Sequence, residues 1–209
     1  MKYPGKLISI EGLDGCGKST LAHELATELQ TRGCKVVLTK EHGGTPLGTK
    51  LRQIVHSTTE KVCAKTEFLL IAADRAQHFY EVVVPALQAG AIVISDRMDD
   101  SSLAYQGYGR ELDLDLIATV NRWAMNNITK DLVLYLVLDY QTALKRVGTR
   151  QETLTSFEQE KAAFWKKVSA GYEKIFAGRP EVARLDASNK PAVIVRQAVE
   201  ILQKQGIIS

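Results

Sequence analysis

Short runs of apolar, mostly β-branched residues alternate along this chain with longer stretches in which apolar residues recur at every third or fourth position. The short runs predict buried β-strands, and the longer stretches predict amphipathic helices. We predict strands at residues 6–10, 35–39, 91–95, 132–138 and, from a weaker pattern, 182–185. We predict helices at residues 18–31, 47–55, 66–88, 112–127, 140–147, 157–177 and 191–203. This alternation is typical of parallel strands joined by helical crossovers, so the expected fold class is α/β, a parallel sheet of these five strands with helices on both faces.

Two of the predicted helices carry features that affect their shape. Pro85 lies inside the pattern of residues 66–88, where its missing N–H predicts a kink or the start of a second short helix. In residues 157–177, apolar side chains recur at helical spacing, which indicates core packing. These side chains are Phe157, Phe164, Val168, Tyr172 and Phe176.

The composition is that of an ordinary globular protein. The chain has 209 residues, enough for one α/β domain with a full core, so we expect residues 1–209 to form a single domain. A formal net charge of +3 gives no reason to expect a nucleic acid or a membrane as a partner. No signal-peptide pattern follows Met1, and the three cysteines are odd in number and lack metal-ligand spacing. These features favour the reducing cytoplasm.

A glycine-rich segment directly follows the first predicted strand. Residues 12–19 read GLDGCGKS and precede a predicted helix, which is the order of strand, glycine loop and helix found in a phosphate loop. The glycines let successive backbone N–H groups turn towards one anion, and the positive end of the helix dipole adds to the attraction. Lys18 can reach the terminal phosphates of ATP, and the Ser19 hydroxyl can ligate Mg²⁺. The expected ATP-binding residues are Gly12, Leu13, Asp14, Gly15, Cys16, Gly17, Lys18, Ser19 and Thr20.

A phosphate loop is shared by kinases, GTPases, transporter ATPases and motors. The guanine-specificity pattern Asn-Lys-x-Asp is absent, because the nearest match, Asn189-Lys190, continues with Pro191 and Ala192. The sequence therefore disfavours a GTPase, and a second ligand site has to distinguish the other classes.

Polar residues end the second and third predicted strands, at the edge where open parallel sheets bind ligands. Residues 41–46 read EHGGTP after the second strand, a pattern that an ordinary connecting loop also shows. The third strand leads into Asp96 and Arg97. Asp96 is placed to hold Mg²⁺ or to orient an acceptor, and Arg97 is placed to bind a phosphate through two hydrogen bonds.

Arg75 falls among apolar residues of a predicted helix. A guanidinium in such a place needs a partner. A bound phosphate is one candidate partner, and Glu67 or Asp74 is the internal alternative.

Taken together, these segments resemble the thymidylate kinase family over most of the chain. The family pattern is an acidic residue in the phosphate loop, a Glu-Pro-Gly-Gly-Thr turn, a buried helical arginine, Asp-Arg followed by Ser and Ala-Tyr-Gln, and a lid that carries arginines. The matching residues are Asp14, Glu41-His42-Gly43-Gly44-Thr45, Arg75, Asp96-Arg97 with Ser101, Ala104-Tyr105-Gln106, and Arg146 with Arg150. The resemblance implies a P-loop kinase fold with a short lid at about residues 148–157, ATP and dTMP as substrates, Mg²⁺ as cofactor, and a homodimer.

The resemblance also implies a role for each matched residue. Asp14 would hold the 3′-hydroxyl of the acceptor, and three arginines would surround its phosphate. Tyr105 would close the space below the 2′ position, which would favour deoxyribose because a 2′-hydroxyl would lack a hydrogen-bond partner there. The implied acceptor-binding residues are Asp14, Glu41, Arg52, Ile71, Arg75, Arg97, Ser102, Tyr105 and Gln106. The implied metal ligands are Ser19 and Asp96, the catalytic residues are Lys18, Arg97, Arg150 and Asp14, and Arg146 would lie next to ATP.

Three positions depart from the family pattern. His42 stands where the family has proline, and Ile71 stands where it usually has a phenylalanine that stacks on thymine. Ser156 lies in a Thr-Ser-Phe-Glu run where the second lid arginine is expected, which leaves Arg150 and Arg146 to carry the positive charge of the lid. Ile71 favours, as an alternative, a nucleoside monophosphate kinase of other or broader base specificity. Ser156 favours a catalytically weak nucleotide-binding protein.

Overall fold

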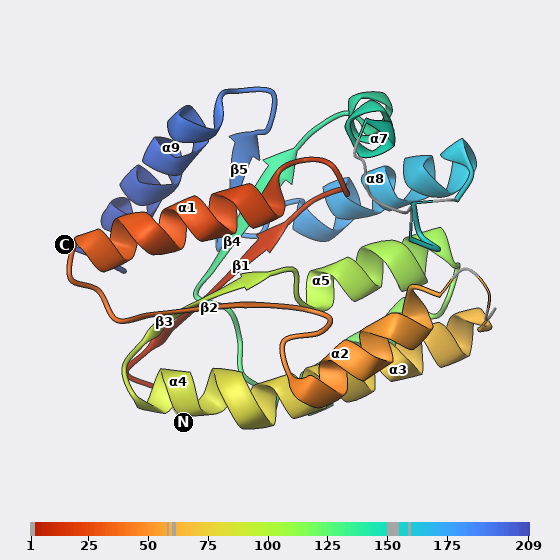
Figure 1. Ribbon diagram of the computed structural model, residues 1–209, viewed down its shortest axis with the longest axis horizontal. Coiled ribbons are helices and arrows are strands. Elements are labelled where there is room, and N and C mark those ends of the chain that lie inside the picture. Colours follow the sequence, from red (N-terminus) through yellow and green to blue (C-terminus); the bar gives the residue numbers. More distant parts are fainter. Residues whose placement is uncertain (1–2, 58, 60–61, 150–154, 159) are drawn as a thin grey trace.

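The computed structural model describes residues 3–57, 59, 62–149, 155–158 and 160–209, and it shows one parallel sheet with helices around it (Figure 1). The strand order is β2-β3-β1-β4-β5, and every neighbouring pair is parallel. The strands are β1 (Lys6–Glu11), β2 (Val36–Lys40), β3 (Ile92–Asp96), β4 (Leu132–Val137) and β5 (Val182–Asp186). The expected α/β fold with five parallel strands is therefore confirmed.

The helices lie on both faces of the sheet and beyond the carboxyl ends of its strands (Figure 1). The α-helices are α1 (Lys18–Thr31), α2 (Pro46–Val55), α3 (Ala64–His78), α4 (Val84–Gln88), α5 (Asp99–Ser102), α6 (Leu114–Ala124), α7 (Tyr140–Gly148), α8 (Ala162–Phe176) and α9 (Pro191–Lys204). Two π-helical segments, η1 (Phe79–Val83) and η2 (Leu103–Gly109), continue α3 and α5. Among the described helices, none is long and apolar enough to cross a membrane.

Successive residues of the central strand β1 face opposite sides of the sheet, and both sides are buried. Leu7 packs in a cluster with Phe79 and with Leu87 of α4. Ile8 lies in the cluster that contains Leu25 of α1. Because both faces are covered, β1 reads as a continuous apolar run rather than an alternating one. Since all strands are parallel, their carboxyl ends meet at one edge, where Glu11 leads into the glycine loop and Asp96 ends β3.

The helix predicted at residues 66–88 is interrupted before Pro85, as expected. The π-helical turn η1 separates α3 from α4, and Pro85 lies in the first turn of α4. The Val84 N–H bonds to the Phe79 carbonyl, five residues back, so the helix widens just before the proline, which has no N–H to donate.

The prediction was wrong at two helical segments. Residues 99–109 form α5 and η2, although no helix was predicted there. Their polar and glycine-rich sequence has little helical pattern, and packing against α8 holds them in place. Tyr108 of η2 lies so close to Gly171 of α8 that a Cβ at position 171 would be 2.8 Å from its side chain. Phe157 lies in a turn before α8, which begins at Ala162, yet its side chain is buried as the apolar stripe suggested.

Candidate active site

The glycine loop after β1 has the backbone of an anion cradle. Gly12, Gly15 and Gly17 have φ angles of 143°, 84° and 96°, in the region that disfavours residues with a side chain. Two of these positions also lack space, because a Cβ on Gly12 would lie 2.7 Å from the Leu136 carbonyl oxygen and one on Gly15 would lie 2.6 Å from a neighbouring carbonyl. Gly17 is the N-cap of α1 and offers no side chain to its first N–H groups. The loop and the start of α1 can therefore bind phosphate oxygens.

The polar side chains of the loop lie close together. Lys18 is buried, with its Nζ donating to the Leu13 carbonyl at 2.8 Å and lying 3.8 Å from Oδ1 of Asp14. The exposed hydroxyl of Ser19 donates to the carboxylate of Asp96 at the end of β3. The structure thus brings the two expected metal ligands into contact. A hydroxyl and a carboxylate are the hard oxygen donors that suit Mg²⁺, which usually completes its shell with water and substrate phosphates.

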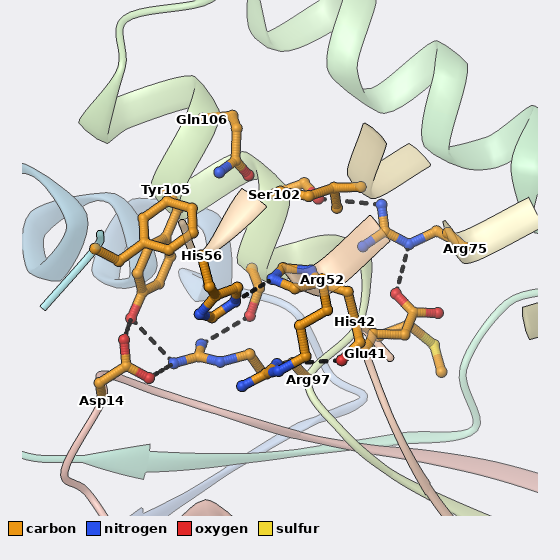
Figure 2. A pocket seen from close by; sticks show the side chains of 14 residues that line it. Asp14, Glu41, His42, Arg52, His56, Arg75, Arg97, Ser102, Tyr105 and Gln106 are labelled. Carbon is orange, nitrogen blue, oxygen red and sulfur yellow. Dashed lines mark hydrogen bonds and ion pairs between the residues drawn. The ribbon is translucent and has the colours of Figure 1, made fainter. Parts of the chain in front are cut away.

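A pocket lies on the other side of Asp14 (Figure 2), and its lining includes all nine residues expected to bind the acceptor. Its lining residues are Asp14, Glu41, His42, Arg52, His56, Ile71, Arg75, Arg97, Met98, Ser101, Ser102, Tyr105, Gln106 and Phe157. They come from the glycine loop, the turn after β2, α2 and the residue that follows it, α3, the link between β3 and α5, the α5–η2 helix and the turn before α8. Segments far apart in the sequence therefore build one pocket at the carboxyl edge of the sheet.

Arg97 connects this pocket to the glycine loop. Its Nη2 donates to the Asp14 carboxylate and to the Tyr105 hydroxyl at 3.0 Å. Its Nη1 donates to the Gly12 carbonyl at 3.0 Å and to the hydroxyls of Ser101 and Tyr172. The φ angle of Arg97 is 71°, an uncommon value for a residue with a side chain, and such values concentrate at functional sites.

Arg75 is buried at the opposite end of the pocket, where its partner differs from both internal candidates. Its Nε donates to Oε2 of Glu41 at 2.7 Å, and its Nη1 donates to Ser102 and to Asn121. The predicted internal partners are engaged elsewhere. Glu67 pairs with Arg110 at 3.0 Å, and Asp74 accepts the Gly43 N–H at 3.1 Å. Arg75 still lines the cavity, so its hydrogen bonds to protein groups fix the guanidinium without removing it from the pocket.

The charges of the pocket favour an anion. Three guanidinium groups, those of Arg52, Arg75 and Arg97, line it together with the carboxylates of Asp14 and Glu41. Burial lowers the pKa of Arg52, and the charge of Arg97 lowers this pKa further. Burial opposes ionisation of Asp14, but the charges of Arg97 and Lys18 outweigh it and hold the pKa of that carboxyl well below its usual range. An added phosphate would relieve the repulsion between the arginines.

The expected lid residues are only partly described. Arg150 lies outside the described residues. Arg146 lies on the exposed side of α7 and donates to the Ala187 carbonyl at 3.1 Å, which places it beside the loop that joins β5 to α9. Ser156, at the end of the expected lid, contacts α2, because its hydroxyl donates to the Val55 carbonyl at 2.9 Å.

Sequence reasoning missed several residues that line the pocket. His56 and Phe157 belong to no recognised motif, and Met98 lies between the Asp-Arg pair and the helix that was not predicted. The turn that contains His42 does form without proline: the Glu41–His42 peptide is cis, and the His42 carbonyl accepts from Arg52 at 3.1 Å. Periodicity gives no signal for His56, because its side chain reaches the pocket from the end of α2.

A phosphate loop that shares a sheet edge with an arginine-lined pocket is the arrangement of a P-loop kinase, which holds a phosphoryl donor and an acceptor face to face. Comparison with known proteins refines this class. The family model described as thymidylate kinase matches residues 10–198. The chain is 40% identical over 195 residues to the thymidylate kinase of Halothermothrix orenii, covering 92% of this chain and 94% of the relative. It is 38% identical over 209 residues to that of an Exiguobacterium species, covering 97% and 98%, and 39% identical over 204 residues to that of Pelotomaculum thermopropionicum, covering 95% and 94%. The chain belongs to the thymidylate kinase family.

Proposed function

We propose that this protein transfers the γ-phosphoryl group of ATP to dTMP, giving dTDP and ADP for dTTP synthesis. The observation that carries the proposal is the pocket beside the glycine loop, where the nine residues that the family pattern assigns to the acceptor lie together. Membership of the thymidylate kinase family makes the protein a nucleoside monophosphate kinase, and no observation favours a weakly active nucleotide-binding protein.

In the proposed mechanism the two phosphates meet between the glycine loop and Arg97. The ATP phosphates rest on the loop amides and on Lys18, whose side chain is held by the Leu13 carbonyl. The acceptor phosphate lies against Arg52, Arg75 and Arg97, and one of its oxygens attacks the γ-phosphorus in line. The chain's cations stabilise the charge that spreads over the transferred group, so catalysis consists mainly of positioning and electrostatics.

Ser19 and Asp96 would hold Mg²⁺, since their side chains already meet at the edge of the loop. When bound, the ion neutralises charge on the phosphates of ATP. The catalytic residues in this proposal are Lys18, Arg97, Asp14 and Arg150. Arg146 and the loop at residues 186–190 would flank ATP, because the hydrogen bond to Ala187 ties them together.

Acceptor selection would follow from the walls of the pocket. The Tyr105 hydroxyl donates to Asp14 at 3.1 Å, which fixes the ring where we place the sugar. Rings of Phe157, Phe164, Trp165 and Tyr172 pack edge-on around it. A rigid ring leaves no hydrogen-bond partner for a 2′-hydroxyl and favours deoxyribose. Ser102, Gln106 and Ile71 would face the base.

We also propose that the protein is a cytoplasmic homodimer, with residues 1–209 forming one domain and residues 148–157 its lid. Apolar side chains are exposed on α3, on η1 and on α6, which packs beside α3. They include Leu69, Tyr80, Leu116 and Trp123, of which the last is 77% exposed. A second copy would cover this surface. Sedimentation should show a dimer, and Trp123→Glu should shift it towards monomer.

Steady-state rates with ATP and dTMP, dUMP, dCMP, dGMP or UMP test the proposed function. We expect kcat/KM to be highest for dTMP by about tenfold or more, and UMP to be the poorest acceptor. Lys18→Ala is the control, in which turnover should fall by orders of magnitude while the fold is retained. Equal rates across the panel, or near-normal activity of Lys18→Ala, would contradict the proposal.

A further inference from the structure

Two histidines face each other inside the acceptor pocket. Nε2 of His42 and Nε2 of His56 lie 3.1 Å apart, and the rings meet edge-on with centroids 5.2 Å apart (Figure 2). His42 lies in the turn after β2, and His56 follows the last residue of α2. Arg52, one turn earlier in α2, donates to the His42 carbonyl at 3.1 Å, so the pair is attached to one of the arginines that we assign to the acceptor phosphate.

The hydrogen bond between the rings fixes their protonation. One Nε2 must carry a proton and the other must offer its lone pair, so a neutral pair has one protonated and one unprotonated Nδ1. A pair with one added proton has both Nδ1 atoms protonated, and both then donate outwards. Nδ1 of His56 is buried and has no hydrogen-bond partner within the described part of the chain. The pair therefore holds a buried ring nitrogen without a partner in the wall of the pocket that both rings line, and a bound ligand can supply that partner.

The groups around the pair keep it neutral when the pocket holds no anion. Positive charge faces it from Arg52 of α2, Arg75 of α3 and Arg97 after β3. Negative charge comes from Asp14 of the glycine loop, which is already paired with Arg97, and from Glu41, which precedes His42 and is paired with Arg75 and His78. Asp74 of α3 accepts the N–H of Gly43, the residue after His42, and burial followed by the charge of Glu41 raises its pKa to about 6. The Phe157 ring, which packs on His56, and the Tyr105 ring complete the surroundings. Burial, followed by the charge of Arg52, lowers the pKa of His56 to about 4. Burial, the neighbouring ring and Arg52 hold the pKa of His42 well below its usual value.

We propose that His42 and His56 form part of the acceptor-phosphate site, and that binding of a dianionic phosphate monoester adds one proton from solvent to the pair. The inference rests on the proposed function, because it requires the acceptor phosphate to lie at Arg52 and Arg97. Two negative charges in the pocket reverse the field that keeps the rings neutral. The protonated pair donates Nδ1–H groups to phosphate oxygens and adds a positive charge to a site whose lid has serine at position 156. An uncharged nucleoside brings no such charge and adds no proton.

Titration calorimetry of dTMP binding in buffers of different ionisation enthalpy tests this inference at pH 7. The observed enthalpy, plotted against that of the buffer, has a slope equal to the protons taken up. The double variant His42→Asn/His56→Leu measures the proton contribution of the ligand itself, whose phosphate has a pKa near 6. His23→Asn, on the exposed side of α1, is the matched control for loss of an imidazole. We expect the unsubstituted protein and His23→Asn to take up about one proton more than the double variant, and thymidine to cause no uptake.

The dependence of affinity on pH gives a second measure. The complex of the unsubstituted protein holds one more proton than the free protein, so a lower pH should favour binding. The ratio of its dTMP affinity to that of the double variant should rise as the pH falls, by up to about tenfold per pH unit near pH 7. The ¹⁵N NMR chemical shifts of the imidazole rings report protonation directly in the unsubstituted protein. They should show that one imidazolium appears when dTMP binds at pH 7. Equal proton numbers, or neutral rings in the complex, would overturn the inference while dTMP binding and turnover stood. Absence of both binding and turnover would instead overturn the proposed function, and the inference with it.

Discussion

Arg97 bonds to Asp14 and thereby links the glycine loop to the acceptor pocket: its Nη2 donates to the Asp14 carboxylate, and its Nη1 donates to the Gly12 carbonyl at 3.0 Å. A substitution at Asp14 should therefore change the kinetic constants for the acceptor more than those for ATP. We expect Asp14→Asn to lower kcat/KM for dTMP by about tenfold to a hundredfold, because a hydrogen bond to a charged group contributes about 1.5 to 3 kcal/mol. The KM for ATP should change much less.

The 3′-hydroxyl provides a sharper form of this prediction. If Asp14 holds that hydroxyl, the substitution should matter little when the acceptor is the 3′-deoxy analogue of dTMP. Measuring kcat/KM for both proteins with both acceptors gives a double-mutant cycle, which isolates the coupling between Asp14 and the 3′-hydroxyl. The same loss with both acceptors would show that Asp14 acts only through Arg97.

The Arg75–Glu41 pair should dominate the stability of the other end of the pocket. Both side chains are buried, at 1% and 3% residue exposure, and their atoms lie 2.7 Å apart. Arg75→Met removes the guanidinium from the buried Glu41 carboxylate and leaves it only the contact with His78, so we expect the free energy of unfolding to fall by about 3 to 5 kcal/mol. Glu41→Gln in the same chain should recover part of that loss. A small effect in denaturant unfolding of Arg75→Met alone would mean that the pair adds little to stability.

Ile71 should set how strongly the base is recognised. Its side chain is buried against the pocket at a position where the family usually has phenylalanine. Ile71→Phe should lower the KM for dTMP by roughly twofold to tenfold, because an aromatic stack contributes about 0.5 to 1.5 kcal/mol. Thermal unfolding of the variant is the control, since a larger side chain can overpack the site. An unchanged KM in a stably folded variant would show that the base does not lie at this position.

Glu11 should make the stability depend on pH. It is buried beneath the site and accepts hydrogen bonds from the Met98 N–H, Ser101 and Tyr172. Burial, and then the charge of Asp100, raise the pKa of Glu11 from 4.5 to about 7. Between these values the folded state holds a proton that the unfolded state has lost, so the stability contributed by this group is lost as the pH rises through that window.

The comparison with Glu11→Gln isolates this effect from other titrating groups. The difference in free energy of unfolding, unsubstituted protein minus variant, should fall by about 1 to 3 kcal/mol between about pH 5 and pH 7.5. Parallel stability curves for the two proteins would contradict this prediction.

The sequence predicted those parts of the fold and site that short-range patterns encode. Strand β1 and the glycines after it were predictable because a buried apolar run and positive φ angles restrict the residue types at each position. The α5–η2 helix was not, because tertiary packing against α8 holds its polar residues, as the close contact between Gly171 and Tyr108 shows. The partner of Arg75 could not be predicted either, because Glu41 is 34 positions away in the chain and reaches it only when β2 and α3 are packed.

The central claim is that one gap holds two phosphorylated molecules, one on the amides near Lys18 and the other on the arginines across from it. A compound that joins adenosine and thymidine 5′ to 5′ through five phosphates should occupy both sites, so its inhibition constants against ATP and against dTMP measure the claim directly. We predict competitive inhibition against each substrate, with an affinity well above that of either nucleotide alone. Competition with only one of the two substrates would show that the sites do not face each other.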